Sequence, residues 1–268
     1  MAIIPESYLN SVVSIGVRIN SNEIIWIGTG FFVGSSSGQG NQIYPFLVSN
    51  KHVFEGKDNV VIRMKKKGSE DLQIVNVRLK SDDDRILYVS HEIADIDIAV
   101  LLLNAQVIKD EDFDFPCFHI DQNAMSSAEL RSQGFDEGSI IYMLGFPMGL
   151  VNEDSNIPIC RMGCVSRMSE VQIREQHNML VDIQNFPGNS GSPIITRPEM
   201  VAIKGTQSLD KSVLLGIVHS YIPYKEKLIN SQTNKVVEIR SENSGIALVH
   251  PVEYIRDIIK KLQDDISN

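Results

Sequence analysis

Ser190 lies in the stretch NFPGNSGSPI, residues 185–194. Gly, Pro, Asn and Ser are turn-forming residues, so an ordinary loop would account for this composition. A serine hydroxyl acts as a nucleophile only where a base takes its proton, a carboxylate orients that base and fixed N–H groups stabilise the oxyanion. Gly188 and Gly191 permit a sharp turn, which would let the N–H groups of Gly188 and Ser190 converge on one oxygen.

Candidates for the base and the carboxylate lie at two apolar, strand-like segments. His52 ends the segment FLVSNKHVF, and a strand end is a good position from which to direct an imidazole into a cleft. Asp97 stands at the start of an apolar run in ADIDIAVLLL, where a partly buried carboxylate needs a partner. Asp95 is the alternative, because residues two apart along a strand share one face.

The segments around these residues resemble those of chymotrypsin-like serine peptidases. The order VSNKHV, DIAVLL, GNSGSP is most similar to the bacterial branch that includes the HtrA (Deg) type and other intracellular trypsin-like domains. The resemblance covers roughly residues 10 to 260 and implies roles for the three residues. Ser190 would be the nucleophile, His52 the base, and Asp97 rather than Asp95 the orienting acid. Four more segments carry the resemblance: GTGFFVG (28–34), YMLGFPMGL (142–150), GCVS (163–166) and LGIVHS (215–220).

Two positions depart from the family pattern. Position 189 is Asn where secreted relatives have an Asp that pairs with a new N-terminal ammonium. A neutral amide does not reward burial of an ammonium in that way, so we expect no activating cleavage of this type. His219 stands where relatives have a serine that supports the aspartate. Three roles stay open for His219: a core residue, a support of the triad, or part of the substrate pocket.

The expected substrate-binding residues are Gln184, His219, Ser220 and Tyr221. By alignment with the family, Gln184 lies near the floor of the primary pocket. No acidic residue occurs in QNFPG to bind Arg or Lys. We therefore expect a small or medium uncharged residue before the cleaved bond, with Tyr221 narrowing the pocket entrance.

The rest of the chain predicts the scaffold. Short segments rich in Val and Ile recur through the first 250 residues, separated by Gly, Asn, Asp and Ser. This spacing favours an all-β sandwich or barrel over βαβ units. Among the segments, KVVEIR (235–240) and SGIALV (244–249) are predicted as separate strands, and NAMSSAELRS (123–132) as a short helical turn. The helical period after Pro251 predicts a C-terminal helix.

The resemblance implies two six-stranded antiparallel β-barrels followed by that helix. We expect an N-terminal barrel over residues 1–115 carrying His52 and Asp97, and a connection over 116–136. A second barrel over 137–250 would carry Ser190, and the helix would occupy 251–268.

Composition limits the partners. The 268 residues carry a net charge of −9, which argues against nucleic acid or an anionic membrane as the main partner. The first ten residues lack a secretion signal, and Cys117, Cys160 and Cys164 are few and odd in number. These features favour the cytoplasm. No cofactor and no metal site are expected, because the histidines lack ligand-like spacing.

The predicted function is that of a serine endopeptidase acting on protein or peptide substrates. A peptidase in the cytoplasm must spare its host, so we expect narrow specificity or an activating protein partner. The alternative is a catalytically silent domain that binds peptides or proteins through the same cleft. An esterase or acyltransferase is less consistent with the strand pattern, because esterase serines usually sit between a strand and a helix.

Overall fold

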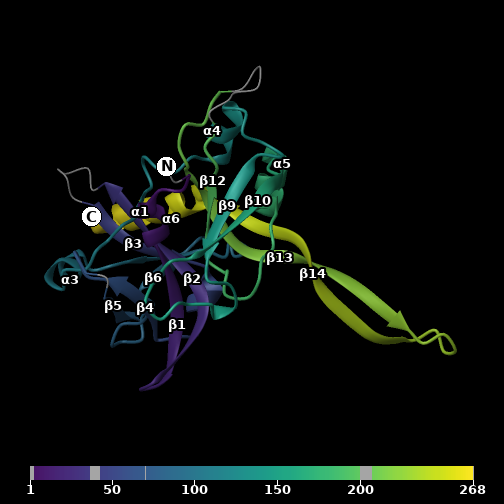
Figure 1. Ribbon diagram of the computed structural model, residues 1–268, viewed down its shortest axis with the longest axis horizontal. Coiled ribbons are helices and arrows are strands. Elements are labelled where there is room, and N and C mark those ends of the chain that lie inside the picture. Colours follow the sequence, from purple (N-terminus) through teal and green to yellow (C-terminus); the bar gives the residue numbers. More distant parts are fainter. Residues whose placement is uncertain (1–2, 37–42, 70, 200–206, 268) are drawn as a thin grey trace.

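The computed structural model describes residues 3–36, 43–69, 71–199 and 207–267. Most of its regular structure is β, and the longest helix closes the chain (Figure 1). None of the described helices is both long and apolar enough to span a membrane.

The N-terminal half is built around one large sheet. The strands follow the order β5-β4-β1-β2-β3-β7-β6, and β8 pairs with β2, so the sheet has eight strands rather than the expected six. Closure of this sheet into a barrel stays a prediction. Its elements are α1 (Glu6–Asn10), β1 (Val12–Asn20), β2 (Glu23–Ser36), β3 (Ile43–Ser49), α2 (Lys51–Phe54), β4 (Asn59–Lys65), β5 (Leu72–Arg78), β6 (Tyr88–Ser90), β7 (Ala99–Leu102), α3 (Ala105–Asp110) and β8 (Phe118–His119).

The C-terminal half forms a closed six-stranded barrel with the order β10-β11-β14-β13-β12-β9. Strands β13 and β14 continue well beyond the barrel, so the two strands predicted at 235–240 and 244–249 are one strand. The elements are α4 (Ser127–Ser132), β9 (Ile140–Gly145), η1 (Pro147–Gly149), β10 (Ile159–Arg167), α5 (Glu170–Gln176), β11 (Met179–Asp182), β12 (Pro193–Thr196), β13 (Leu214–Ile229), β14 (Val236–Pro251) and α6 (Val252–Ser267).

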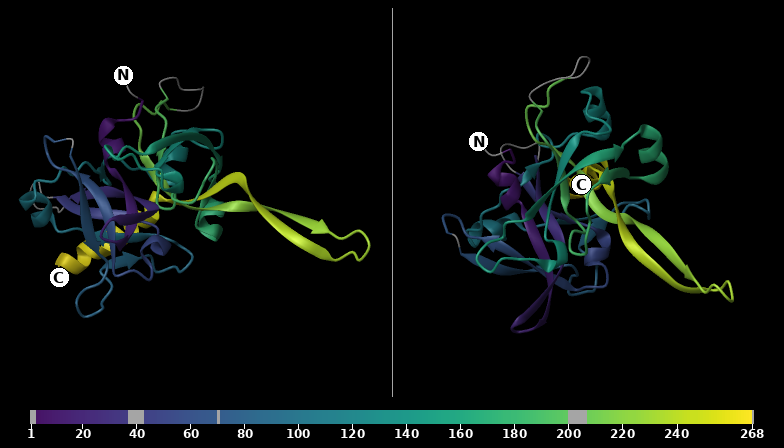
Figure 2. Two further views of the ribbon diagram at one scale, coloured as in Figure 1. Left: turned by 60° about the horizontal axis from the view of Figure 1, so that its bottom comes forward. Right: turned by 45° about the vertical axis from the view of Figure 1, so that its right-hand side comes forward.

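Helix α6 packs across both halves (Figure 2). Val252, Ile255, Ile258 and Ile259 recur at helical spacing and are almost fully buried. They join one apolar cluster that includes strand residues of the N-terminal sheet and of the barrel. Burial of this stripe therefore stabilises the contact between the halves as well as the helix itself.

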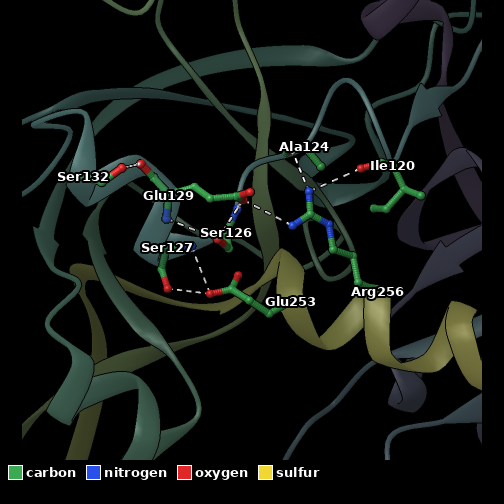
Figure 3. A network of polar contacts seen from close by, with 8 residues as sticks. All are labelled: Ile120, Ala124, Ser126, Ser127, Glu129, Ser132, Glu253 and Arg256. Atoms are coloured by element: carbon green, nitrogen blue, oxygen red, sulfur yellow. Dashed lines mark hydrogen bonds and ion pairs between the residues drawn. The ribbon is translucent and has the colours of Figure 1, made fainter. Parts of the chain in front are cut away.

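Polar contacts fix the start of α6 against the connection between the halves (Figure 3). Glu253 accepts hydrogen bonds from the backbone and the hydroxyl of Ser127, at 3.0 and 2.5 Å. Arg256 donates to the Ala124 carbonyl at 2.8 Å and lies 3.3 Å from Glu129. Glu129 also forms a reciprocal capping box with Ser126 at the start of α4. The predicted helical turn at 123–132 thus becomes an anchor for α6.

Thr29, in β2, connects the N-terminal sheet to two loops of the barrel. Its N–H donates to the Ser190 carbonyl at 2.8 Å, and its hydroxyl donates to the Gly188 carbonyl at 2.7 Å. The same hydroxyl accepts from the Phe146 N–H at 3.1 Å, while the Thr29 carbonyl accepts from the Ser49 hydroxyl at 2.7 Å. Thr29 is fully buried, so these groups have no access to water as an alternative partner.

Replacing Thr29 by Val keeps the shape but removes the hydroxyl. We expect the free energy of unfolding to fall by about 2–3 kcal/mol, because the Gly188 carbonyl and the Phe146 N–H lose a buried partner. Thr29→Ser is the matched control, since it keeps the hydroxyl and loses only a methyl group, worth about 1 kcal/mol. Urea titration measures both variants. Equal stability of Thr29→Val and Thr29→Ser would contradict the role given to the hydroxyl.

Candidate functional site

His52 and Asp97 form a close pair. The His52 Nδ1 and Asp97 Oδ2 atoms are 2.5 Å apart, and the His52 N–H donates to Asp97 Oδ1 at 3.0 Å. Both carboxylate oxygens therefore face α2, which is separated from the end of β3 by one residue. The rival Asp95 is exposed, and no hydrogen bond joins it to His52. Of the two candidate acids, the structure brings only Asp97 to the imidazole.

The Asp97 backbone is held on both sides. The Ile98 N–H donates to the Ile96 carbonyl at 3.0 Å, so Asp97 is the central residue of a tight three-residue turn. Its carbonyl accepts from the Asn50 side chain at 2.7 Å. Its N–H donates to Nε2 of His250 at 3.0 Å. This turn lies directly before β7 and presents the carboxylate to His52.

His250 is buried behind Asp97, and its partners fix its tautomer. Nδ1 lies 2.6 Å from the His177 carbonyl and must carry a proton to donate to it. Nε2 accepts from the Asp97 N–H and must therefore be unprotonated. The ring of His219 stacks on His250, with centroids 3.8 Å apart and planes 9° from parallel. Nε2 of His219 is buried without a hydrogen-bond partner among the described residues.

Burial controls the charge of these groups. Desolvation lowers the pKa of His219 to about 3, and the adjacent His250 acts in the same direction. Desolvation also lowers the pKa of His250, against the opposing effects of the His177 carbonyl and of Asp97. For Asp97, burial opposes ionisation, but hydrogen bonds from His52 outweigh it and lower the pKa of the carboxyl. At neutral pH, two neutral imidazoles therefore lie behind an ionised Asp97.

The loop that carries Ser190 packs against β2 beside α2. The Ser190 carbonyl accepts from the Thr29 N–H at 2.8 Å. A Cβ atom on Gly28 would lie 2.9 Å from Val53 and 3.3 Å from the Ser190 carbonyl, so both meet at this glycine. Val53 directly follows His52, so the two candidate catalytic segments meet at Gly28. Among the described residues, no hydrogen bond joins the Ser190 hydroxyl to His52.

The backbone of this loop depends on glycine at two positions. Gly188 and Gly191 have φ values of +93° and +89°. A Cβ on Gly188 would lie 2.4 Å from the Phe146 carbonyl, and one on Gly191 would lie 2.0 Å from the Thr29 carbonyl. Within the described chain, the N–H groups of Gly188 and Ser190 have no acceptor. These two N–H groups are the candidate donors for an oxyanion.

Asn189 is buried under β9. Its side chain is 1% exposed, and neither end of the amide has a partner among the described residues. Gly145 makes this packing possible, because a Cβ there would lie 2.9 Å from the Asn189 oxygen. A buried neutral amide at this position offers no counter-charge to an ammonium.

Three of the four expected substrate-binding residues, His219, Ser220 and Tyr221, are consecutive on β13. Ser220 and Tyr221 lie on β13, and the Ser220 carbonyl accepts from the Asn185 side chain at 3.0 Å, next to the Ser190 loop. Gln184 is exposed. His219 packs on His250, a position that fits a core residue or a support of Asp97 better than a pocket wall.

The sequence pattern gave no role to Thr29, Asn50 or His250. Thr29 lies inside a segment that resembles the family, but nothing local marks its contacts. His250 is 153 positions from Asp97, and a histidine ending an apolar strand was the one available signal.

Elsewhere, a cavity of about 620 Å³ between α1 and residues 115–119 shares no residue with this site. In the described ranges, no cluster of three or more His, Cys, Asp or Glu residues is suited to a metal ion.

Comparisons with known proteins bear on this arrangement. The family model of the trypsin-like peptidase domain matches residues 28–203. No curated protein matches the chain. Similar solved structures include the MamO protease domain from Magnetospirillum magneticum in its apo form, which is 12% identical with a TM-score of 0.50. That match covers 94% of this chain and 97% of the MamO protease domain.

Two further structures are similar over most of this chain. The VesB protease of Vibrio cholerae is 15% identical with a TM-score of 0.50, and the match covers 97% of this chain and 66% of VesB. The HtrA-type protease AlgW with a decapeptide is 16% identical with a TM-score of 0.49, with coverage of 95% and 66%. At such identities, MamO and VesB show a shared fold and nothing more.

Replacing His250 by Phe tests whether this residue positions Asp97. Phe fills the space but accepts no hydrogen bond, so we expect the free energy of unfolding to fall by about 1–3 kcal/mol as the Asp97 N–H loses its buried partner. The downfield proton NMR signal of the His52–Asp97 hydrogen bond should also weaken. In the control His250→Gln, an amide oxygen can accept from Asp97, and the signal should be retained. An unchanged signal in His250→Phe would rule out positioning by His250.

Acid should destabilise the protein before the carboxylates titrate. His219 and His250 have lowered pKa values in the folded state, so below pH 6.5 the unfolded chain binds more protons. Their stabilising effect is complete above pH 6.5 and is lost as the pH falls toward the folded pKa, about 3 for His219. We expect a slope of about 1.4 kcal/mol per pH unit for each proton taken up. Urea titrations between pH 6.5 and 5 measure this slope. In His219→Leu the slope should fall by the contribution of one proton, about 1.4 kcal/mol per pH unit.

Proposed function

The chain belongs to the trypsin-like peptidase domain family, and from that premise we propose that it is a serine endopeptidase. The observation that carries the proposal is the His52–Asp97 pair, in which both carboxylate oxygens bind the histidine. Membership of the family and the trypsin-like fold do not by themselves establish activity. The chemistry of the site provides the further argument.

In the proposed reaction, the Ser190 hydroxyl attacks the carbonyl carbon of a peptide bond. His52 takes the hydroxyl proton on Nε2 while Asp97 accepts the hydrogen bond from Nδ1–H. The carboxylate keeps the imidazole in the required tautomer and stabilises the imidazolium that forms. The two bonds between His52 and Asp97 support this role, because the one at Nδ1 orients the ring and the one from the backbone N–H orients the carboxylate.

The oxyanion of the tetrahedral intermediate would bind the N–H groups of Gly188 and Ser190. Both amides lack a protein acceptor in the described chain, and two glycines with positive φ hold the loop in shape. His52 then gives its proton to the leaving amine, and an acyl group remains on Ser190. Water, activated by the same histidine, releases the acid and restores the enzyme.

We further propose that the peptidase acts in the cytoplasm and that a protein partner or ligand controls it. The buried neutral Asn189 supports control without a cleaved N-terminus, since it cannot neutralise an ammonium. Ser220 and Tyr221 on β13 would contact the substrate, with Gln184 at the pocket. The absence of an acidic residue at QNFPG supports a preference for small or medium uncharged side chains.

A fluorophosphonate probe tests the nucleophile. We expect covalent labelling of the wild-type protein and none of Ser190→Ala or His52→Ala, because the first lacks the reacting oxygen and the second lacks the base. Asp97→Asn should reduce the rate of labelling by about 10⁴-fold through the wrong imidazole tautomer. Asp95→Asn is the matched control and should label normally. Failure to label under all conditions, candidate partners included, would favour the silent binding domain.

Peptide-library profiling follows on the labelled protein, with Ser190→Ala as the blank. Cleavage separates a peptidase from an esterase that uses the same residues. The expected profile has a small or medium uncharged residue before the cleaved bond, and dominant cleavage after Arg would overturn this specificity.

A further inference from the structure

Strands β13 and β14 leave the barrel together as a two-stranded arm, residues 222–243 (Figure 1, Figure 2). They pair with each other from the barrel out to Ile229 and Val236. In the barrel, β12 covers the outer edge of β13 and β11 covers that of β14 as far as Ile246. Beyond these points, neither edge of the arm has a strand partner among the described residues.

The arm exposes more apolar surface than a solvated hairpin needs. Its large apolar side chains are 37–69% exposed, and an isolated two-stranded ribbon is at best marginally stable in water. A long open edge with apolar residues is also a template for pairing with another strand. The exposed residues are Ile222, Tyr224, Leu228, Ile229, Val236, Val237 and Ile239.

The charge of the arm permits self-association, although the whole chain carries −9. Residues 222–243 contain four cations and three carboxylates, so the arm is nearly neutral. Two copies can therefore approach through their arms without the repulsion that their other surfaces would bring.

The edge of β13 is poorly suited to pair with itself. Pro223 has no N–H to donate to a neighbouring strand. Further out, the order Lys225, Glu226, Lys227 places like charges opposite one another when two copies pair symmetrically about Glu226. When the two copies pair symmetrically about Lys225 or about Lys227, that lysine stands opposite the same lysine of the other copy. Such like-charge pairs are unfavourable on adjacent strands.

The edge of β14 is complementary to itself in one register. When two copies pair antiparallel about Ile239, Glu238 of each copy stands opposite Arg240 of the other. Within one chain these two side chains share a face and already contact each other, with Arg240 Nε 3.1 Å from Glu238 Oε1. The four groups would form a square in which every neighbour has the opposite charge. The same register pairs Val237 with Ser241 and stays within the uncovered part of β14.

We propose that this edge binds a second copy of the chain, so that two arms form a continuous four-stranded sheet about a two-fold axis at Ile239. Symmetric pairing of one surface with itself is the usual arrangement in homodimers. The proposal does not depend on the peptidase activity.

Charge reversal tests the register. Glu238→Arg makes the square wholly positive and Arg240→Glu makes it wholly negative, so each variant alone should dimerise at least about tenfold more weakly in analytical ultracentrifugation. An equimolar mixture of the two variants should recover dimers, because the squares are then complementary. The double variant Glu238→Arg/Arg240→Glu should also dimerise. A wild-type protein that stays monomeric at all concentrations would overturn the proposal, as would dimers that are insensitive to these changes.

Cysteine cross-linking tests the edge. In this register the two Ile239 residues are directly opposite, at a spacing that suits a disulfide. With the exposed Cys160 replaced by Ser, Ile239→Cys should form a covalent dimer on mild oxidation. Lys227→Cys is the matched control, because Lys227 lies opposite Ile239 on the other strand of the same arm and should not cross-link. Cross-linking of Lys227→Cys without cross-linking of Ile239→Cys would place the contact on the β13 edge and overturn the proposal.

Discussion

The buried hydrogen bonds of Thr29 hold the site together. One residue of the N-terminal sheet binds the carbonyls of Gly188 and Ser190 and receives the N–H of Phe146. The histidine and the aspartate come from one half of the molecule and the serine from the other, so their relative placement depends on how the halves meet. Packing of α6 across both halves supplies apolar burial, but that burial is not directional. The hydrogen bonds of Thr29 are directional, so they fix how the two halves are oriented relative to each other.

A second constraint acts on Asp97. A carboxylate that binds an imidazole must be held at a fixed angle, and here the restraint acts on its backbone through Asn50 and His250. Because His250 accepts at Nε2, it can do so only while neutral, and burial keeps it neutral. The stacked His219 completes an apolar environment around two rings that would otherwise charge in mild acid. The His52–Asp97 hydrogen bond thus lies above two uncharged imidazoles.

Much of this arrangement could be predicted from the sequence. The strand segments, the terminal helix, and the order His52, Asp97, Ser190 all follow from patterns local to each segment or from the resemblance. The partnership of His250 with Asp97 could not, because it joins residues 153 positions apart and depends on how the strands are placed in space. The arm was missed for a related reason. Val236, Val237 and Ile239 indicate a strand, but the same pattern occurs whether that strand is buried in a barrel or exposed outside it.

The late position of β14 in the chain has a consequence for biosynthesis. A nascent polypeptide that has already emerged past Ser190 still lacks the imidazole that binds the Asp97 amide and the helix that joins the halves. The aspartate turn therefore cannot be fully restrained while the last quarter of the protein is still being made. Full restraint of Asp97 thus arises only after translation has passed His250.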